Sequence, residues 1–424
     1  MASCKKTEYE VFLIFDETRK TFVPAPCSRC SCFGGNFFCS HMVAVILYLS
    51  IIQHDKYNNI EVIIAYMPME IKLFQTKCVS WELLFGDIQG LSVSSNKVSN
   101  FSALAKKLLE NDFLVSGVDN LCYEQDFENI AKKINPSEKK SFTYNFADTR
   151  DISLLKHLVN LNKPDLIVHF GDLSSVYSCN HNPNYTESVN INGALNVIQI
   201  CNENKIPLLI NSSSSIYGAQ PSRHFCSEND SLPIPTDLYC NSKIRIENLL
   251  LQSHINNPSF KYIVFRPATV FGEGIRFRIE LLPNHFCYSA LQSNVIRVAD
   301  LNAYRAFIHV DTLISSYIHV LNNDIFNNEI YNIGSFNLTK LDVALSIQRN
   351  LDCKIVTMPD IGDLRNLQLS CDKFNKDIGF NLDDNFDIRM VELLNWLKLN
   401  LEHYNESKFS GLLNMPLSQW MNLI

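Results

Sequence analysis

From about residue 88 onward, short apolar runs alternate with longer segments whose apolar residues recur at helical spacing. The apolar runs predict buried strands at 113–118, 165–170, 207–210, 261–265 and 330–333. Apolar residues at positions i, i+3 and i+4 predict amphipathic helices at 102–109, 151–161, 187–202 and 238–250. Strands that alternate with helices predict an α/β fold with a doubly wound parallel sheet, in which ligands bind beyond the carboxyl ends of the strands.

Charge and hydropathy argue against two classes of protein, general nucleic-acid binders and membrane-spanning proteins. The 424 residues include 37 basic and 44 acidic side chains, a net charge of −7, which disfavours a general nucleic-acid binder. No apolar run reaches the roughly 18–20 residues that span a membrane, since the nearest run, 42–52, is too short. We therefore expect no membrane contact, no secretory signal, a cytoplasmic location and reduced thiols among the 14 cysteines.

Two segments carry the chemistry when they are taken together. The serine run INSSSSIYG, 210–218, follows a predicted strand directly, and LYCNSK, 238–243, opens a predicted helix. Tyr239 and Lys243 are four residues apart, so on a helix they share a face, where the ammonium would lower the pKa of the phenol. With a serine hydroxyl at the strand end, this set suits proton transfer at an alcohol or carbonyl, the partner step of hydride transfer by a nicotinamide.

Seven segments resemble, in the same order, motifs of the extended short-chain dehydrogenase/reductase family, in its nucleotide-sugar epimerase and dehydratase branch. They are DLIVHF, NPNYTESVNINGALNVIQIC, INSSSSIYG, LYCNSK, RPATVFGEG at 266–274, AYRAFIHVDTL at 303–313 and IYNIGS at 330–335. The resemblance extends over residues 88–402. It implies a Rossmann-like sheet followed by a smaller substrate lobe, mainly residues 267–402.

The resemblance also implies roles for individual residues. Tyr239 would be the catalytic acid/base, Lys243 would tune it and hold the nicotinamide ribose, and Ser213 would orient the substrate carbonyl. The implied cofactor contacts are Ser95, Asp119, Asp148, Thr149, Phe170, Gly171, Asn190 and Lys243. The implied substrate contacts are Ser213, Thr269 and Arg305. The guanidinium of Arg305 can hold a phosphate with two hydrogen bonds, and its alternative role is a surface ion pair.

The residues after the catalytic serine bear on the reaction. In the dehydratase branch these two positions are Asp and Glu, whereas here they are Ser214 and Ser215. Without those carboxylates, elimination of water lacks its usual acid. The sequence therefore favours an epimerase or a reductase over a 4,6-dehydratase.

The expected glycine fingerprint of a dinucleotide site is absent from the loop SSNKVSNF, 94–101. Its three positions are Ser95, Val98 and Phe101. A non-glycine residue in a left-handed turn costs about 1–2 kcal/mol, Val98 would intrude on the pyrophosphate, and Phe101 would obstruct helix–strand packing. The acidic residue that follows the fingerprint remains, as Asp119, and favours NAD over NADP because a carboxylate repels a 2′-phosphate.

Two interpretations of this loop stay open. In the first, the loop is remodelled and still binds NAD(P), helped by Asp119, Asp148, Phe170 and Gly171. In the second, the domain has lost its cofactor and serves as a catalytically inactive binding or scaffold module.

The N-terminal segment carries a separate candidate site. Cys30, Cys32, Cys39 and His41 form the pattern C-x-C-x6-C-x-H, which resembles a SWIM-type zinc finger and could complete a tetrahedral zinc shell. The alternatives are buried structural cysteines or a simple N-terminal extension. Residues 1–87 hold 8 basic and 9 acidic side chains, 8 − 9 = −1, so a protein partner is expected rather than nucleic acid.

These observations predict three parts, a Cys/His module at 1–87, a dehydrogenase-like domain at 88–402 and a tail at 403–424. The expected function is an NAD(P)-dependent epimerase or reductase that acts on a nucleotide sugar. The alternative is an inactive dehydrogenase-like scaffold protein with a zinc interaction module. The resemblance further implies a homodimer.

Overall fold

The computed structural model describes residues 13–16, 21–24, 91–95, 98–120, 127–135, 141–220, 224–274, 277–359 and 366–400. The chain divides into two compact units, Met1–Phe85 and Gly86–Ile424. In the first unit, strands β1 (Leu13–Asp16) and β2 (Thr21–Pro24) form an antiparallel pair. The candidate zinc ligands Cys30, Cys32, Cys39 and His41 lie outside the described residues, as does the tail 403–424.

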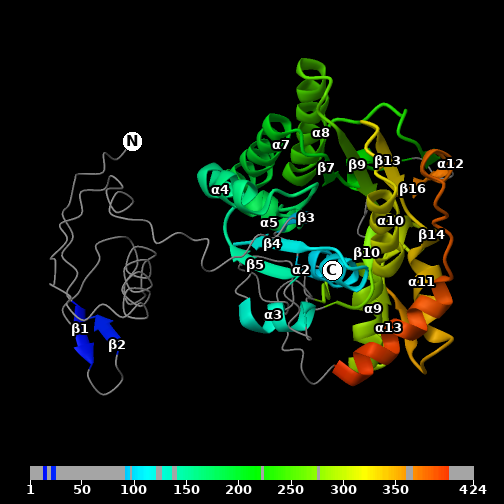
Figure 1. Ribbon diagram of the computed structural model, residues 1–424. Coiled ribbons are helices and arrows are strands. Elements are labelled where there is room, and N and C mark those ends of the chain that lie inside the picture. Colours follow the sequence, from blue (N-terminus) through cyan, green and yellow to red (C-terminus); the bar gives the residue numbers. More distant parts are fainter. Residues whose placement is uncertain are drawn as a thin grey trace, which may run out of the picture. The chain divides into compact units, whose positions relative to one another are not determined.

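The second unit is built on a seven-stranded sheet (Figure 1). In spatial order its strands are β13 (Ile330–Ile333), β9 (Tyr262–Pro267), β7 (Leu208–Asn211), β6 (Ile167–Phe170), β3 (Leu91–Ser95), β4 (Val115–Asp119) and β5 (Phe142–Phe146). Every neighbouring pair runs parallel. The predicted parallel α/β sheet is thus confirmed, and all five strands predicted from apolar runs belong to it.

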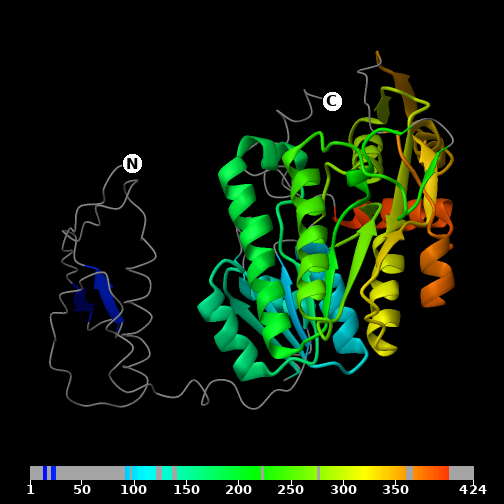
Figure 2. The ribbon, with the colours of Figure 1, turned by 90° about the horizontal axis from the view of Figure 1, so that it is seen from above.

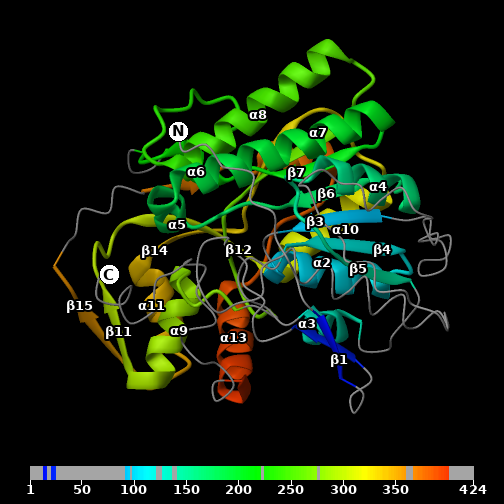
Figure 3. The same cartoon turned by 90° about the vertical axis from the view of Figure 1, so that its left-hand side faces the viewer.

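Helices cover both faces of this sheet (Figure 3). On one face lie α4 (Ile152–Asn162), α7 (Gly193–Asn204) and α8 (Leu238–Asn256). On the other face lie α2 (Val98–Glu110), α3 (Phe127–Ile134) and α10 (Val310–Asn322). The two-sided covering explains why the central strands are continuous apolar runs, since both faces of each strand are buried.

Helix α2 begins earlier than the sequence predicts. The apolar pattern places its start at residue 102, whereas the helix begins at Val98, so only residues 96 and 97 separate it from β3. The loop compared with the glycine fingerprint is therefore mostly strand end and helix start. The side chains of Ser95, Val98 and Phe101 lie outside what the structure describes.

The predicted helix 187–202 is divided in the structure. Short helices α5 (Val176–His181) and α6 (Pro183–Thr186) lead into a π-helical segment, η2 (Glu187–Asn192), which continues as α7. A π-helical turn widens the helix by one residue and is frequent at functional sites. Here it includes Asn190, a predicted site residue.

The smaller lobe follows β9 in the chain. Its sheets are β10 (Thr269–Phe271), β12 (Tyr304–His309) and β14 (Phe336–Thr339), with β11 (Val295–Val298) paired to β15 (Lys354–Thr357). Its helices are α9 (Leu282–Ser293), α11 (Lys340–Gln348) and α13 (Phe386–Asn400). Strand β16 (Gln368–Leu369), which pairs with β8 (Phe225–Cys226) from earlier in the chain, and helix α12 (Asp372–Ile378) belong to the described C-terminal part, yellow to red in Figure 2.

Two hydrophobic clusters hold these parts together. The sheet cluster includes Phe265, Tyr331 and, from α12, Phe374. The lobe cluster includes Phe307 and, from α13, Met390, both fully buried. Among the described helices, none is long and apolar enough to cross a bilayer.

Candidate active site

Helix α8 presents the predicted Tyr–Lys pair at its first turns. The helix starts at Leu238 because the side chain of Asp237 caps it, accepting a hydrogen bond from the Cys240 amide at 2.8 Å. Tyr239 and Lys243 are both buried, and the Lys243 ammonium lies 5.8 Å from the centre of the Tyr239 ring. The two side chains therefore share a face, as their spacing predicts.

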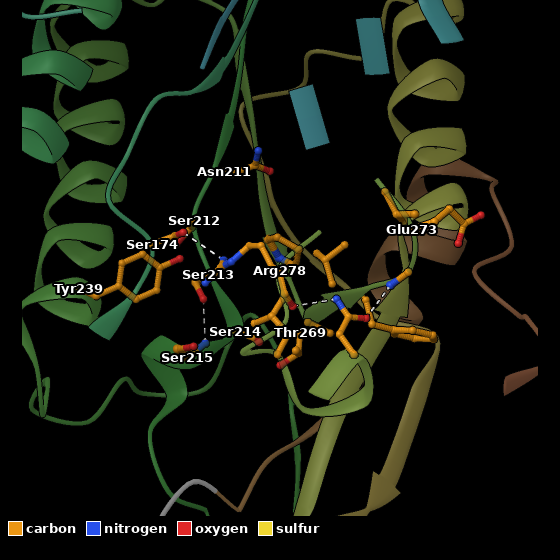
Figure 4. Close-up of a pocket in the computed structure, with 18 residues that line it drawn as sticks. Ser174, Asn211, Ser212, Ser213, Ser214, Ser215, Tyr239, Thr269, Glu273 and Arg278 are labelled. Atoms are coloured by element: carbon orange, nitrogen blue, oxygen red, sulfur yellow. Dashed lines mark hydrogen bonds between the residues drawn. The ribbon is translucent and has the colours of Figure 1, made fainter. Parts of the chain in front are cut away.

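Ser213 joins them from the sheet. Strand β7 ends at Asn211, and the chain turns into a 3₁₀ helix, η3 (Ser214–Tyr217), which Ser213 caps by accepting from the Ser215 amide at 3.2 Å. The Ser213 hydroxyl also shares a side-chain hydrogen bond with Tyr239, and the two residues lie side by side (Figure 4). The structure thus brings the three predicted catalytic residues together.

The protonation of Tyr239 differs from the expectation. The sequence predicts that Lys243 lowers the pKa of the phenol, but in the structure the pKa of Tyr239 is raised well above its ordinary value. Burial is the largest cause because it penalises the charged phenolate, and the negative charge of Asp172 adds to it. The hydrogen bond with Ser213 acts in the opposite direction without overcoming them.

Asp172 is a site residue that the sequence analysis missed. Its carboxylate forms a buried ion pair with the Lys243 ammonium, which also donates a hydrogen bond of 2.6 Å to the Asn211 carbonyl. The signal in the sequence was present, because Asp172 comes two residues after the end of β6, where functional side chains of a parallel sheet gather.

Asn190 links the loop that carries Asp172 to helix α8. Its side-chain oxygen accepts from the Leu173 amide at 2.7 Å, and its amide nitrogen donates to the Leu173 carbonyl and to the Ser242 hydroxyl, both at 3.1 Å. Asn190 is 0% exposed. The predicted cofactor contact is therefore a structural connection between the two elements that hold the catalytic side chains.

Replacing Asn190 with alanine should lower the free energy of unfolding by about 2–4 kcal/mol, because two backbone groups of Leu173 and the Ser242 hydroxyl lose buried partners. Urea unfolding measures this change. The control is Gln199→Ala on the neighbouring helix α7, where an exposed hydrogen bond to Glu203 is lost and a change under about 0.5 kcal/mol is expected. Equal effects of the two substitutions would contradict the assigned role of Asn190.

A cavity of about 150 Å³ opens beside Ser213 and Tyr239 (Figure 4). Its wall includes Thr269, as predicted, and also Glu273 and Arg278, which the sequence analysis did not single out. Arg278 donates to the Ser174 hydroxyl at 3.1 Å and to the Glu280 carboxylate at 2.7 Å. The cavity therefore places a cation and several hydroxyl groups beside the predicted proton-transfer residue.

Arg305, the other predicted substrate contact, does not line this cavity. It lies on β12, is 9% exposed, and its guanidinium donates to the Tyr304 carbonyl at 2.8 Å. Arg278, in the connection between β10 and α9, is the arginine that the structure brings to the cavity wall.

Six of the eight predicted cofactor contacts lie at the carboxyl ends of neighbouring strands, whereas Asn190 and Lys243 lie on η2 and α8. Ser95 ends β3, Asp119 ends β4 and Phe170 ends β6, with Gly171 next in the chain. Asp148 and Thr149 follow β5. These four strands are adjacent in the sheet, so the contacts at their ends form one row along the carboxyl-end side of the sheet.

Side-chain chemistry along this row fits a dinucleotide. The carboxylate of Asp119 is buried at the strand end. The pKa of Tyr144 is raised, chiefly by burial of its phenol and further by the charge of Asp119 and a side-chain hydrogen bond with it. The Thr149 hydroxyl is buried and has no hydrogen-bond partner among the described residues. A side chain at Gly193 would meet this hydroxyl at 2.5 Å, so glycine is required there.

Asp148 is held by its neighbours on this row. Arg150 donates two side-chain hydrogen bonds to its carboxylate, at 2.7 and 2.8 Å, and Asn120 donates a third at 2.7 Å. Burial alone would raise the pKa of Asp148, but these hydrogen bonds outweigh it, and the pKa is lowered. Asp148 is therefore a fixed anionic acceptor at the sheet edge.

The described residues also include one group able to hold a metal ion, His224, Cys226 and Asp230. The His224 imidazole already pairs with the Asp230 carboxylate at 2.7 Å, and Asp230 also accepts from the Ser227 amide and hydroxyl. These contacts account for the cluster as a turn held by hydrogen bonds, and we assign no metal to it.

Residues 102–334 match the model of the NAD dependent epimerase/dehydratase family. This chain belongs to that family. The family member from Saccharomyces cerevisiae, a decarboxylating sterol-4-alpha-carboxylate 3-dehydrogenase, is 26% identical over 42% of this chain and 50% of its own length. The UDP-glucose 4-epimerase of Yersinia enterocolitica is 23% identical over 70% of this chain and 94% of its own length.

Solved structures show the same fold. UDP-glucose 4-epimerase from Thermotoga maritima superposes with a TM-score of 0.65 at 19% identity, covering 73% of this chain and 99% of that one. The dTDP-glucose 4,6-dehydratase of Bacillus anthracis, solved with NAD, gives 0.65 at 19% identity over 74% and 98%. The chain spans about half the length, 50% and 49%, of the first two curated relatives that it matches.

Proposed function

We propose that this family member is a nicotinamide-dependent epimerase or reductase that acts on a nucleotide sugar through Ser213, Tyr239 and Lys243. The observation that carries the proposal is the hydrogen-bonded Ser213–Tyr239 pair at the wall of a cavity, with the Lys243 ammonium behind the phenol ring. Relatives named as epimerases and reductases of nucleotide sugars support the substrate class.

A bound nicotinamide supplies or accepts the hydride. The chain's own residues handle the oxygen atom of the substrate. Ser213 is placed to donate a hydrogen bond to a carbonyl oxygen in the cavity, and the Tyr239 hydroxyl is placed to give that oxygen a proton or to take one from the alcohol. The Lys243 ammonium beside the ring favours the phenolate that remains after the proton leaves, and the Asp172 carboxylate paired with it reduces this effect.

The sheet edge would hold the cofactor. Asp119 would accept hydrogen bonds from ribose hydroxyls and would repel a 2′-phosphate, which favours NAD over NADP. The unpartnered Thr149 hydroxyl and the fixed carboxylate of Asp148 offer further polar contacts on the same row. Ser214 and Ser215 supply no carboxylate beside the substrate, which favours epimerisation or reduction over dehydration.

Arg278 would bind the anionic part of the substrate. Its side chain is 16% exposed and lines the cavity wall, and a planar guanidinium suits a diphosphate. A partner protein for residues 1–87, zinc binding there and homodimerisation stay predictions from the sequence.

Titration calorimetry of the purified protein with NAD and NADP tests the proposal. We expect NAD to bind and NADP to bind more weakly. Asp119→Ala should weaken the binding of NAD by about ten- to hundredfold, because one charged hydrogen-bond acceptor is worth about 1.5–3 kcal/mol. The matched control Asp165→Ala removes an exposed carboxylate before β6, at the opposite end of the sheet, and should leave the affinity unchanged. Absence of binding by either nucleotide would overturn the enzymatic proposal and support the scaffold alternative.

A further inference from the structure

The Lys243 ammonium is paired with the buried carboxylate of Asp172. The side chains of Lys243 and Asp172 are 3% and 4% exposed, and their charged groups are in direct contact. The Asn211 carbonyl accepts a further hydrogen bond from the same ammonium. A lysine that faces a phenol without such a partner would favour the phenolate, whereas this ammonium is already neutralised within the protein.

Other charged or titratable groups also face Tyr239, including Arg278 and Glu273 on the wall of the same cavity. From its own helix come Cys240 and Lys243, with Asp237 at the helix N-cap. The opposing elements contribute Asp172 after β6, Cys179 on α5 and the neutral Ser213 after β7. Among these groups, Asp172 is the largest electrostatic cause that opposes ionisation of the phenol, second only to burial.

Asn190 fixes the position of this carboxylate. Its three hydrogen bonds join Leu173, the residue after Asp172, to Ser242, the residue before Lys243. The two charged residues are thus held together through their sequence neighbours as well as through their own contact. Such a double connection is what a group needs to exert a constant field on Tyr239.

We propose that Asp172 is a positioning residue that holds the Lys243 ammonium and keeps Tyr239 protonated at neutral pH, so that it sets the pH range of proton transfer at the site. The inference rests on the proposed function and deepens it, since it names the residue that controls this pH range. Reduced nicotinamide gives its hydride to the carbonyl carbon and becomes oxidised. The Tyr239 hydroxyl gives its proton to the carbonyl oxygen, the product is an alcohol, and water then returns a proton to Tyr239.

The reverse step depends on the same phenol. Oxidation of an alcohol requires the phenolate as proton acceptor, and its population falls tenfold for each pH unit below the pKa of Tyr239. The rate of alcohol oxidation should therefore rise with pH up to that pKa. Because the two directions share one transition state, Asp172 controls this pH dependence and not a preference for one direction.

The test uses Asp172→Asn, which removes the charge and keeps the shape. Tyrosinate absorbance is titrated in the cofactor-free protein, and the matching Tyr239→Phe protein is subtracted to isolate Tyr239. In the wild type we expect no ionisation of Tyr239 up to about pH 10. In Asp172→Asn the ionisation should move down by about one pH unit or more, because the Lys243 charge is no longer balanced. Both proteins are titrated to the highest pH at which they stay folded, and ionisation of Tyr239 that begins at the same pH in Asp172→Asn as in the wild type overturns the proposal.

Two further proteins separate an electrostatic role from a structural one. Asp165→Asn makes the same substitution at the exposed opposite end of strand β6 and should leave the titration unchanged. If Asp172→Asn does not fold, the double variant Asp172→Asn with Lys243→Met removes both charges, and Tyr239→Phe is again subtracted. Its Tyr239 should ionise at lower pH than that of Lys243→Met alone, and equal titrations overturn the proposal.

A second readout uses the loaded protein. The rate of alcohol oxidation should rise tenfold for each pH unit up to the pKa of Tyr239, and Asp172→Asn should bring the rising limb to lower pH by about one unit or more. An unchanged pH profile in this variant overturns the assigned role. If calorimetry finds no nucleotide binding, the proposed function fails, whereas the tyrosinate titration still decides whether Asp172 controls Tyr239.

Discussion

Tyr239→Phe should lower turnover by about 10²–10⁴-fold, because it removes the only proton that the phenol can transfer and leaves the ring in place. Ser213 keeps its contact with the Ser215 amide, and the ring stays buried against the same helix. Nicotinamide binding measured by calorimetry should remain within about twofold of the wild type. The loss is therefore expected in the rate constant and not in cofactor affinity.

The matched control is Tyr262→Phe. Tyr262 is also a buried tyrosine, but it begins strand β9 at the amino end of the sheet, opposite the edge where the site lies. Turnover of this variant should stay close to that of the wild type. A Tyr239→Phe protein with unchanged turnover would contradict the role of Tyr239 in proton transfer.

Arg266→Met should destabilise the protein by about 3–5 kcal/mol, because it leaves the Glu247 carboxylate buried without its cation. Arg266 donates two hydrogen bonds to Glu247, at 2.9 and 2.7 Å, and a third to the Tyr217 hydroxyl at 2.7 Å. Burial would lower the pKa of Arg266, but the contacts with Glu247 outweigh it and raise the pKa, so the guanidinium is charged at every pH at which the protein folds. Urea or thermal unfolding measures the effect.

Two comparisons show whether this cost comes from an uncompensated charge. Arg245→Met breaks the ion pair with Glu187, whose side chains are 46% and 51% exposed, and should cost less than about 1 kcal/mol. The double variant Arg266→Met with Glu247→Leu removes both charges and should be more stable than Arg266→Met alone. A double variant as unstable as the single one would point to lost packing instead.

The order of strands and helices could be predicted because buried faces require apolar residues at the spacing of a strand or a helix. Strands such as β6 and β9 are covered on both faces, so they are uninterrupted apolar runs. The Tyr239–Lys243 pair could be predicted for an equally local reason, since a spacing of four residues places two side chains on one helix face. Ser213 followed from its position directly after a predicted strand.

The features that could not be predicted depend on contacts between distant segments. The raised pKa of Tyr239 requires knowing that Asp172, 67 residues earlier in the numbering (239 − 172 = 67), meets Lys243 in space. Arg305 is the expected kind of residue, but the path of β12 keeps it off the cavity wall, where Arg278 lies instead. The start of α2 at Val98 was missed because residues 94–101 were compared with the fingerprint loop.

The last described segment of the chain closes both hydrophobic clusters. Phe374 and Ile378 of α12 complete the sheet cluster, whereas Met390 and Leu394 of α13 complete the lobe cluster. During synthesis on the ribosome, neither cluster can be finished until this segment has left the exit tunnel. Between the synthesis of β9 and that of α12, the nascent chain must therefore carry most of its parallel sheet with part of the apolar flank uncovered, which makes it a natural client for chaperones that shield such surfaces.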